Sequence, residues 1–173
     1  AFMAAPGAGP GRDCPLCPRL AEFRVANRSA FPDFFNAPVP SFGSLEARLL
    51  IVGLAPGLKG ANRTGRPFTG DYAGDLLYET LGHFGFARGS YDARADDGLE
   101  LLDARIANAV SCVPPENKPT PAEIATCNVF LKAEIASLPR LKAILALGTV
   151  AHAAVLATFG HKPKDWPFSH GAE

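Results

Sequence analysis

The chain has no excess of charge of either sign, because 17 basic and 17 acidic side chains give its 173 residues a formal net charge of zero. This balance excludes a protein that binds nucleic acid by bulk charge alone, although it leaves room for a local basic groove. The chain also lacks an apolar run of the roughly 20 residues that span a bilayer. The longest run, residues 143–159, is interrupted by Gly148, Thr149 and His152. We therefore expect a buried strand, a turn and an Ala-rich helix there, and no membrane association.

We do not interpret residues 1–11 as a secretory signal, because no basic segment precedes an apolar stretch there. We interpret residues 1–12 as a flexible leader and expect a cytoplasmic protein, in which thiols stay reduced. Hydrophobic residues make up 47% of the chain and charged residues 20%, which is typical of a globular domain. The length suits one domain, which we assign to residues 13–173.

The short apolar run at residues 49–52 predicts a parallel strand that is covered on both faces of a sheet, and two further strands are expected at residues 106–111 and 143–147. A short helix is expected before them at residues 18–29, helical patterns separate them at about residues 72–86 and from Pro121 onward, and Thr149 is a candidate cap for a further helix. This alternation predicts an α/β fold with right-handed crossovers. In such folds ligands bind at the carboxyl ends of the strands.

Two segments between these elements are expected to be irregular. Residues 89–103 carry five acidic side chains, and we interpret them as a solvated excursion. Residues 113–121 contain several prolines and are expected to form no regular structure.

The four cysteines use a spacing typical of a metal or iron–sulfur site. Cys14 and Cys17 form a C-x-x-C pair, and Cys112 and Cys127 flank a loop after the second predicted strand. Four thiolates suit tetrahedral zinc or an iron–sulfur cluster, and spacing alone does not decide between them. The alternatives are four unrelated cysteines, with Cys127 a small core residue, or a thioredoxin-like redox pair.

A glycine-rich loop with three basic side chains follows the first predicted strand. It begins with Gly53-Leu-Ala-Pro-Gly57 and continues through Lys59, Arg63 and Arg66. Free backbone N–H groups and cations suit phosphate oxygens. The loop is neither a Walker loop nor a G-x-G-x-x-G turn, so by itself it predicts only an anion-binding site.

Longer segments of the chain resemble the fifth family of uracil-DNA glycosylases, the UDGb type. The glycine loop and Gly60-Ala-Asn-Arg-Thr-Gly-Arg-Pro-Phe-Thr-Gly-Asp71 resemble its first active-site motif. Asn108-Ala-Val-Ser-Cys-Val-Pro-Pro-Glu-Asn-Lys-Pro119 resembles its next block, and Arg24-Val-Ala-Asn-Arg28 and Phe31-Pro-Asp-Phe-Phe-Asn-Ala-Pro-Val-Pro40 are also similar. The resemblance implies a three-layer αβα sandwich around a mainly parallel sheet. It also implies a [4Fe-4S] cluster held by Cys14, Cys17, Cys112 and Cys127.

The resemblance further implies a monomeric enzyme that flips uracil, or another deaminated base, out of DNA and hydrolyses its N-glycosidic bond. Phe68 is the candidate platform on which the base stacks. Asn108 offers a donor and an acceptor to the base edge. The backbone of Gly53, Leu54, Ala55 and Gly57 would line the pocket.

Asp71 is the candidate catalytic carboxylate, because it can position water and stabilise a cationic sugar. Leu54 and Ala55 are apolar where other glycosylase groups place a polar side chain in this motif, which moves the catalytic role towards Asp71. The competing interpretation makes Asp71 the N-cap of the helix that begins at Tyr72. Candidate contacts to DNA phosphates, each of which can also be an ordinary surface charge, are Lys59, Arg63, Arg66 and Lys118.

One departure from the family pattern concerns the end of the sequence. Glycosylases of this superfamily carry a second motif, a His-Pro-Ser type loop after the fourth strand, and His170 is followed by Gly-Ala instead. We therefore expect a domain that is incomplete at its C-terminal end, with the fourth strand beyond Glu173. This departure keeps open a second class of function, a cluster-containing module that binds uracil-DNA without cleaving it. A third is a nucleotide-binding redox protein.

Overall fold

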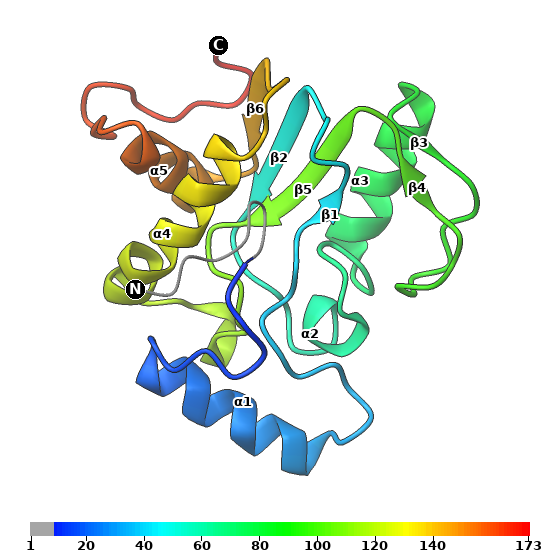
Figure 1. Cartoon of the computed structure of the whole chain (residues 1–173), viewed down its shortest axis with the longest axis vertical. Coiled ribbons are helices and arrows are strands. Elements are labelled where there is room, and N and C mark those ends of the chain that lie inside the picture. Colours follow the sequence, from blue (N-terminus) through cyan, green and yellow to red (C-terminus); the bar gives the residue numbers. More distant parts are fainter. Residues whose placement is uncertain (1–8) are drawn as a thin grey trace.

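A four-stranded sheet forms the centre of the computed structural model, which describes residues 9–173 (Figure 1). Residues 1–8, most of the expected leader, lie outside the described residues. The strands follow the order β1-β5-β2-β6 across the sheet. Their bounds are Phe42–Gly43 for β1, Leu49–Gly53 for β2, Ala104–Asn108 for β5 and Ala143–Ala146 for β6.

The three longer strands are parallel, as the sequence predicts. β2 pairs with β5 on one side and with β6 on the other, and Gly53 lies opposite Asn108 at the carboxyl end. The chain beyond β5 stays beside the chain beyond β2, because Ala109 and Val110 donate hydrogen bonds to the carbonyls of Gly53 and Leu54. The segments that follow β2 and β5, which carry the two motifs of the family resemblance, therefore leave the sheet side by side.

The described sheet has four strands, whereas we expected three within residues 13–173 and a fourth beyond Glu173. The additional strand is β1, which pairs antiparallel with β5 through only two residues. Arg105 of β5 closes this edge, since its guanidinium donates to the Gly43 carbonyl and to Glu134. The mixed α/β fold class with a mainly parallel sheet is confirmed.

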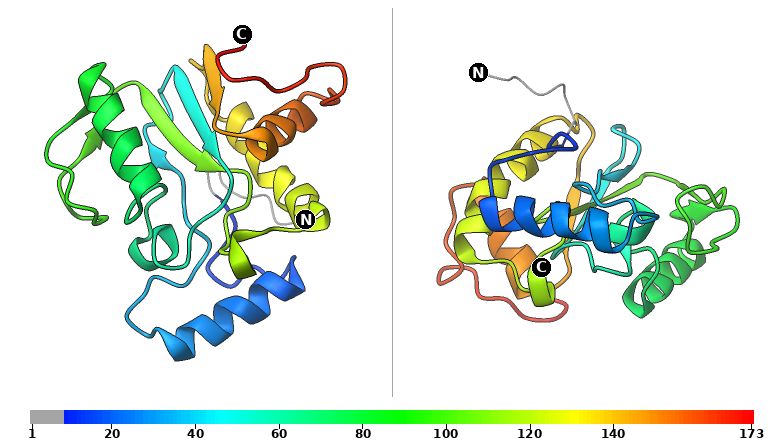
Figure 2. Two further views of the ribbon diagram at one scale, coloured as in Figure 1. Left: turned by 180° about the vertical axis from the view of Figure 1, so that it is seen from behind. Right: turned by 90° about the horizontal axis from the view of Figure 1, so that it is seen from below.

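Helices cover both faces of the sheet and complete three layers (Figure 2). α4 and α5 pack on one face, where Leu50 and Val52 of β2 meet Leu131 of α4 and Ala154 of α5. α3 packs on the other face, where Ile51 belongs to a second cluster of buried hydrophobic residues. The helices span Pro18–Ala30 (α1), Ala61–Thr64 (α2), Tyr72–His83 (α3), Pro121–Ala136 (α4) and Thr149–Thr158 (α5).

Local chemistry explains where α4 begins and corrects the expected cap of α5. Thr120 and Glu123 form a reciprocal capping box, and Pro121 occupies the first turn of α4. Thr149 is the first residue of α5 rather than its cap. The cap position belongs to Gly148, whose φ of 107° suits glycine.

The two segments that were expected to be irregular contain only very short elements. A 3₁₀ helix, Pro115–Asn117, lies within residues 113–121. The acidic excursion is bounded by a short antiparallel pair, β3 (Ala87–Arg88) and β4 (Glu100–Leu101). Leu101 is buried against α3, so this excursion is attached to the core.

α1 lies beyond the carboxyl ends of the parallel strands, away from the sheet faces (Figure 1). A long-range contact joins it to α4, since the Arg19 guanidinium donates to the Glu123 carboxylate and to the Lys118 carbonyl. The N-terminal helix is thereby tied to the loop that follows β5. Within residues 9–173, every helix is too short or too polar to cross a bilayer.

Candidate active site and cysteine pocket

Phe68 and Asn108 meet over Gly53 at the end of β2. A Cβ atom on Gly53 would collide with the Phe68 ring and would lie 2.7 Å from Oδ1 of Asn108. Only glycine at this position lets the aromatic ring and the amide approach each other. The structure thus brings together three residues of the predicted base-binding set.

Phe68 has a backbone conformation that is unusual for a bulky residue, with φ of 54°. Contacts from α3 hold it there. The Tyr78 hydroxyl donates to the Pro67 carbonyl at 2.6 Å. Gly74 packs so closely that an added Cβ would collide with the Phe68 carbonyl oxygen. The position of the aromatic ring is therefore set by the first turns of a helix.

The amide of Asn108 has an unused acceptor. Its Oδ1 atom is buried and accepts no hydrogen bond from residues 9–173. A buried acceptor without a partner is unfavourable by about 1–3 kcal/mol. This oxygen is therefore well suited to an N–H group on a ligand.

Asp71 serves as the N-cap of α3, and its two carboxylate oxygens face different neighbours. Oδ1 accepts a hydrogen bond from the Gly74 amide at 2.8 Å. Oδ2 points towards the glycine loop and lies 3.0 Å from the position of an added Cβ on Gly60. The capping interpretation of Asp71 is confirmed, and it leaves one oxygen directed at the loop.

That loop and Asp71 line a cleft of about 500 Å³. It is formed by residues 54–60, Gly70, Asp71 and Asn117. Phe68 and Asn108 adjoin it at Gly53, the residue before the cleft-lining loop. Neither side chain is among the residues that line the cleft, but the glycine motif connects the two places, because it begins at Gly53 and continues to Asp71.

Asn117 is a cleft residue that the sequence analysis did not single out. It follows Glu116 in the 3₁₀ helix, and both have a positive φ, 58° and 55° respectively. Asparagine adopts this conformation more readily than most residues. An amide after two prolines in the second block was the signal that could have identified it.

The four candidate phosphate contacts fall into two groups. Lys59, Arg63 and Lys118 are exposed. Arg66 is 3% exposed, and its guanidinium forms two hydrogen bonds of 2.8 Å with the Asp97 carboxylate. This guanidinium holds the pKa of Asp97 well below its usual range. Only the first three present a cation to solvent, and the expected phosphate role of Arg66 is corrected on that ground.

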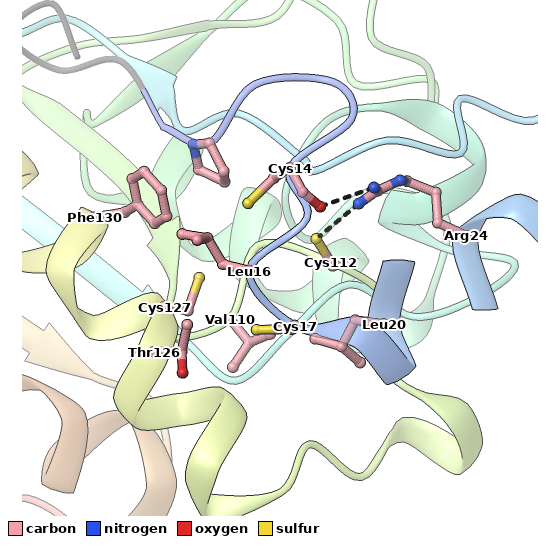
Figure 3. A pocket seen from close by; sticks show the side chains of 11 residues that line it. Cys14, Leu16, Cys17, Leu20, Arg24, Val110, Cys112, Thr126, Cys127 and Phe130 are labelled. Atoms are coloured by element: carbon pink, nitrogen blue, oxygen red, sulfur yellow. Dashed lines mark hydrogen bonds between the residues drawn. The ribbon is translucent and has the colours of Figure 1, made fainter. Parts of the chain in front are cut away.

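The four cysteines line one pocket, although nearly a hundred residues separate the two pairs (Figure 3). Cys14 and Cys17 come from the segment before α1, Cys112 from the loop after β5 and Cys127 from α4. All four are free thiols. The pocket wall is otherwise largely apolar, with contributions from Leu16, Leu20, Val110 and Phe130.

A buried arginine closes the pocket on the α1 side. Nη1 of Arg24 donates to the Cys112 sulfur at 3.7 Å, and Nη2 donates to the Cys14 carbonyl at 2.9 Å (Figure 3). Burial raises the pKa of Cys112 to about 12, and it also raises the pKa of Cys17 and of Cys127. Across residues 9–173, no three His, Cys, Asp or Glu side chains form a group that could hold a single metal ion.

Comparison with known proteins identifies the family of this chain. A family model described as the uracil DNA glycosylase superfamily matches residues 40–172. The chain belongs to the uracil DNA glycosylase superfamily. The matched residues include the sheet, the cleft and both Phe68 and Asn108. Cys14, Cys17 and α1 precede them.

Similar uracil DNA glycosylases come from several organisms. A protein named type-5 uracil-DNA glycosylase from Thermus thermophilus is 44% identical over 164 residues, which cover 92% of this chain and 74% of the relative. One of the same name from Mycobacterium leprae is 46% identical over 166 residues, 91% of this chain and 72% of its own. A type-4 uracil-DNA glycosylase from Thermotoga maritima is 40% identical over 135 residues, 76% of this chain and 62% of its own. The two type-5 relatives confirm the resemblance to the fifth family.

Proposed function

We propose that this chain is a DNA repair glycosylase that flips uracil out of DNA and hydrolyses its N-glycosidic bond. In this reaction the bond between the base and C1′ of the sugar breaks. The water oxygen is transferred to C1′ and a proton to the departing base, which leaves an abasic site. The family membership and the names of the similar proteins support the proposal.

The observation that carries the proposal is the pair formed by Phe68 and Asn108 over Gly53. A flipped base loses its stacking, and an aromatic ring recovers about 1–3 kcal/mol of it. The buried Oδ1 of Asn108 lacks a donor from residues 9–173, and the N–H group of uracil can supply one. Stacking and hydrogen bonding thus converge on one planar base.

Asp71 is the group that we expect to act on the sugar and the water. Its Oδ2 faces the cleft while Oδ1 is held by the Gly74 amide, so the carboxylate has a fixed orientation. A carboxylate at this position stabilises the positive charge that develops on the sugar and orients the attacking water. Asn117 lines the same cleft and offers a second polar group. Lys59, Arg63 and Lys118 are the candidate contacts to DNA phosphates.

The direct test measures release of uracil from a double-stranded oligonucleotide that contains one uracil. We expect an alkali-sensitive abasic site in this substrate and none in the matched thymine oligonucleotide. Tight binding to uracil-DNA without base release would contradict the proposed activity and favour the alternative of a module that binds uracil-DNA without cleaving it. The absence of both binding and release would contradict any proposal in which this chain acts on DNA.

We also propose that the cysteine pocket holds a [4Fe-4S] cluster through Cys14, Cys17, Cys112 and Cys127. The donor set fits, because four free thiols surround one largely apolar pocket. A single zinc ion needs its sulfurs at about 2.3 Å. Within residues 9–173 no three such ligands are grouped around a single ion, so the four thiols would suit a larger group than one metal ion. When bound, the cluster would supply four iron–sulfur bonds that join the segment before α1 to the loop after β5.

Replacement of Cys112 by serine is expected to remove most of the iron and the brown colour of protein purified without air. Serine lacks the thiolate that iron prefers. Cys112 is also the cysteine whose sulfur accepts a hydrogen bond from Arg24. Thr126→Ser, on the same pocket wall, is the matched control and should retain both. Stoichiometric zinc in the parent protein, or full iron in Cys112→Ser, would contradict the assignment.

A further inference from the structure

Arg66 lies in the middle of the first motif but is turned away from the solvent. Its side chain is 3% exposed, and the Asp97 side chain that it meets is 0% exposed. A buried guanidinium is unfavourable unless each of its donors has a partner. Here Nη1 and Nη2 each bond one oxygen of Asp97, and Nε donates to Oγ1 of Thr69 at 2.9 Å. All three nitrogens are thereby used inside the protein.

Three aromatic rings surround the same guanidinium. Its central carbon lies 5.0 Å from the ring centre of Phe42, 5.2 Å from that of Tyr78 and 5.7 Å from that of Tyr91. Such distances allow cation–π attraction, which is stronger when the cation is desolvated. The rings come from β1, α3 and the acidic excursion. Arg66 therefore joins three separate parts of the chain.

Asp97 is fixed as firmly as Arg66. Its carboxylate also accepts hydrogen bonds from the backbone amides of Asp92, at 2.8 Å, and Leu99, at 3.0 Å. These bonds fold the excursion around the carboxylate. The acidic segment that reads as a solvated loop in the sequence therefore supplies a buried anchor.

The anchored residues flank Phe68 on both sides. Arg66 and the carbonyl of Pro67 are held before it, and Thr69, which is fully buried, is held after it. A positive φ at a bulky residue persists only where neighbouring contacts fix the backbone. The bonds of Arg66 supply these contacts across a span of four residues.

We propose that Arg66 and Asp97 are positioning residues, which clamp residues 66–69 so that the Phe68 ring faces the flipped base. The clamp rests on the proposed function, because the platform has a purpose only if a base is bound. Arg66 acts through Phe68 and does not touch the substrate. The acidic excursion, 89–103, thereby becomes part of the active-site framework.

The test compares the clamp with a matched ion pair on the same excursion. Arg66→Lys keeps the charge but removes the two-pronged geometry, and Asp97→Asn keeps the shape but removes the charge. Arg88→Lys is the control, since Arg88 and Glu100 form an exposed pair at 2.7 Å on β3 and β4. Three quantities are measured on folded protein: the single-turnover rate of uracil release, the affinity for uncleaved DNA, and amide hydrogen exchange in residues 66–69.

We expect Arg66→Lys and Asp97→Asn each to lower the single-turnover rate by about 100-fold, since small displacements of a positioned group have effects of that size. Exchange at residues 66–69 should be faster in both, and the affinity for uncleaved DNA, measured on the matched thymine oligonucleotide from which no base is flipped, should be unchanged. Arg88→Lys should match the parent in all three. The salt dependence of DNA binding distinguishes the clamp from a phosphate contact. If Arg66 contacted a phosphate, Arg66→Gln would reduce the slope of log K against log salt concentration by about 0.9.

Two results would overturn the clamp. One is a parental rate per folded molecule in both variants, with only the thermal stability lowered, which is the signature of a merely structural ion pair. The other is a reduced salt slope in Arg66→Gln together with parental exchange. A parent protein that releases no uracil would refute the proposed function instead, and the exchange measurement would still decide whether residues 66–69 depend on Arg66.

Discussion

Replacement of Asp71 by asparagine is expected to lower the single-turnover rate of uracil release by about 10²–10⁴-fold while leaving the fold intact. Loss of the charge removes the group that we propose orients water and stabilises the cationic sugar, and acid–base groups contribute rate factors of that order. The amide oxygen of asparagine can still accept the hydrogen bond from Gly74, because asparagine caps helices as well as aspartate. Rates on a uracil oligonucleotide and thermal melting of the same preparations check both parts.

Asp71→Ala separates catalysis from helix capping. It removes the charge and the cap together, so it should be as inactive as Asp71→Asn and also less stable, by about 0.5–2 kcal/mol. If Asp71 is a cap and nothing more, the order reverses: asparagine supports full activity, and alanine loses activity only in proportion to unfolded protein.

Replacement of Gly74 by alanine is expected to damage both the fold and the site. An alanine inside a helix ordinarily stabilises it by about 1 kcal/mol relative to glycine. At this position the new methyl group would collide with the Phe68 carbonyl oxygen and lie 3.2 Å from Oδ1 of Asp71. Crowding of this kind destabilises by about 1–3 kcal/mol. Displacement of Phe68 should also lower the rate by about 100-fold.

Gly82→Ala is the matched control, because Gly82 lies in the same helix with nothing within 4 Å of an added Cβ. It should raise the free energy of unfolding by about 0.5–1 kcal/mol and leave activity unchanged. If denaturant melts show that Gly74→Ala lowers the free energy of unfolding and Gly82→Ala raises it, the close packing of α3 against Phe68 is supported. Equal and favourable effects would show that the helix does not restrain the platform.

The parts of the fold that the sequence predicts are those with a dense local signal. β2 is covered on both faces, so its four consecutive apolar residues, 49–52, mark it directly. β1 has two residues, one of them glycine, and its pairing with β5 depends on a partner more than 60 positions away. Thr149 reads as a cap because its hydroxyl suits one, but the backbone turns at Gly148 instead.

The candidate site divides in the same way. The glycines and the Asp71 cap follow from neighbouring residues, so a motif can contain them. The orientation of the Arg66 side chain does not follow from neighbouring residues, because its partner Asp97 lies 31 positions later in a segment whose other acidic residues are mostly exposed. A basic residue among glycines is typical of a surface loop. Only tertiary packing distinguishes Arg66 from Arg63.

The cysteine pocket has a consequence for the order of events during synthesis. Cys14 and Cys17 leave the ribosome early, but Cys127 belongs to α4 and follows 110 positions later. The complete set of four sulfurs therefore exists only once α4 has emerged and docked on the sheet. Until then the first pair is carried by a segment whose tie to Glu123 has not yet formed. If the pocket holds the cluster that we propose, delivery of iron would be a late step of maturation, after α4 has docked on the sheet.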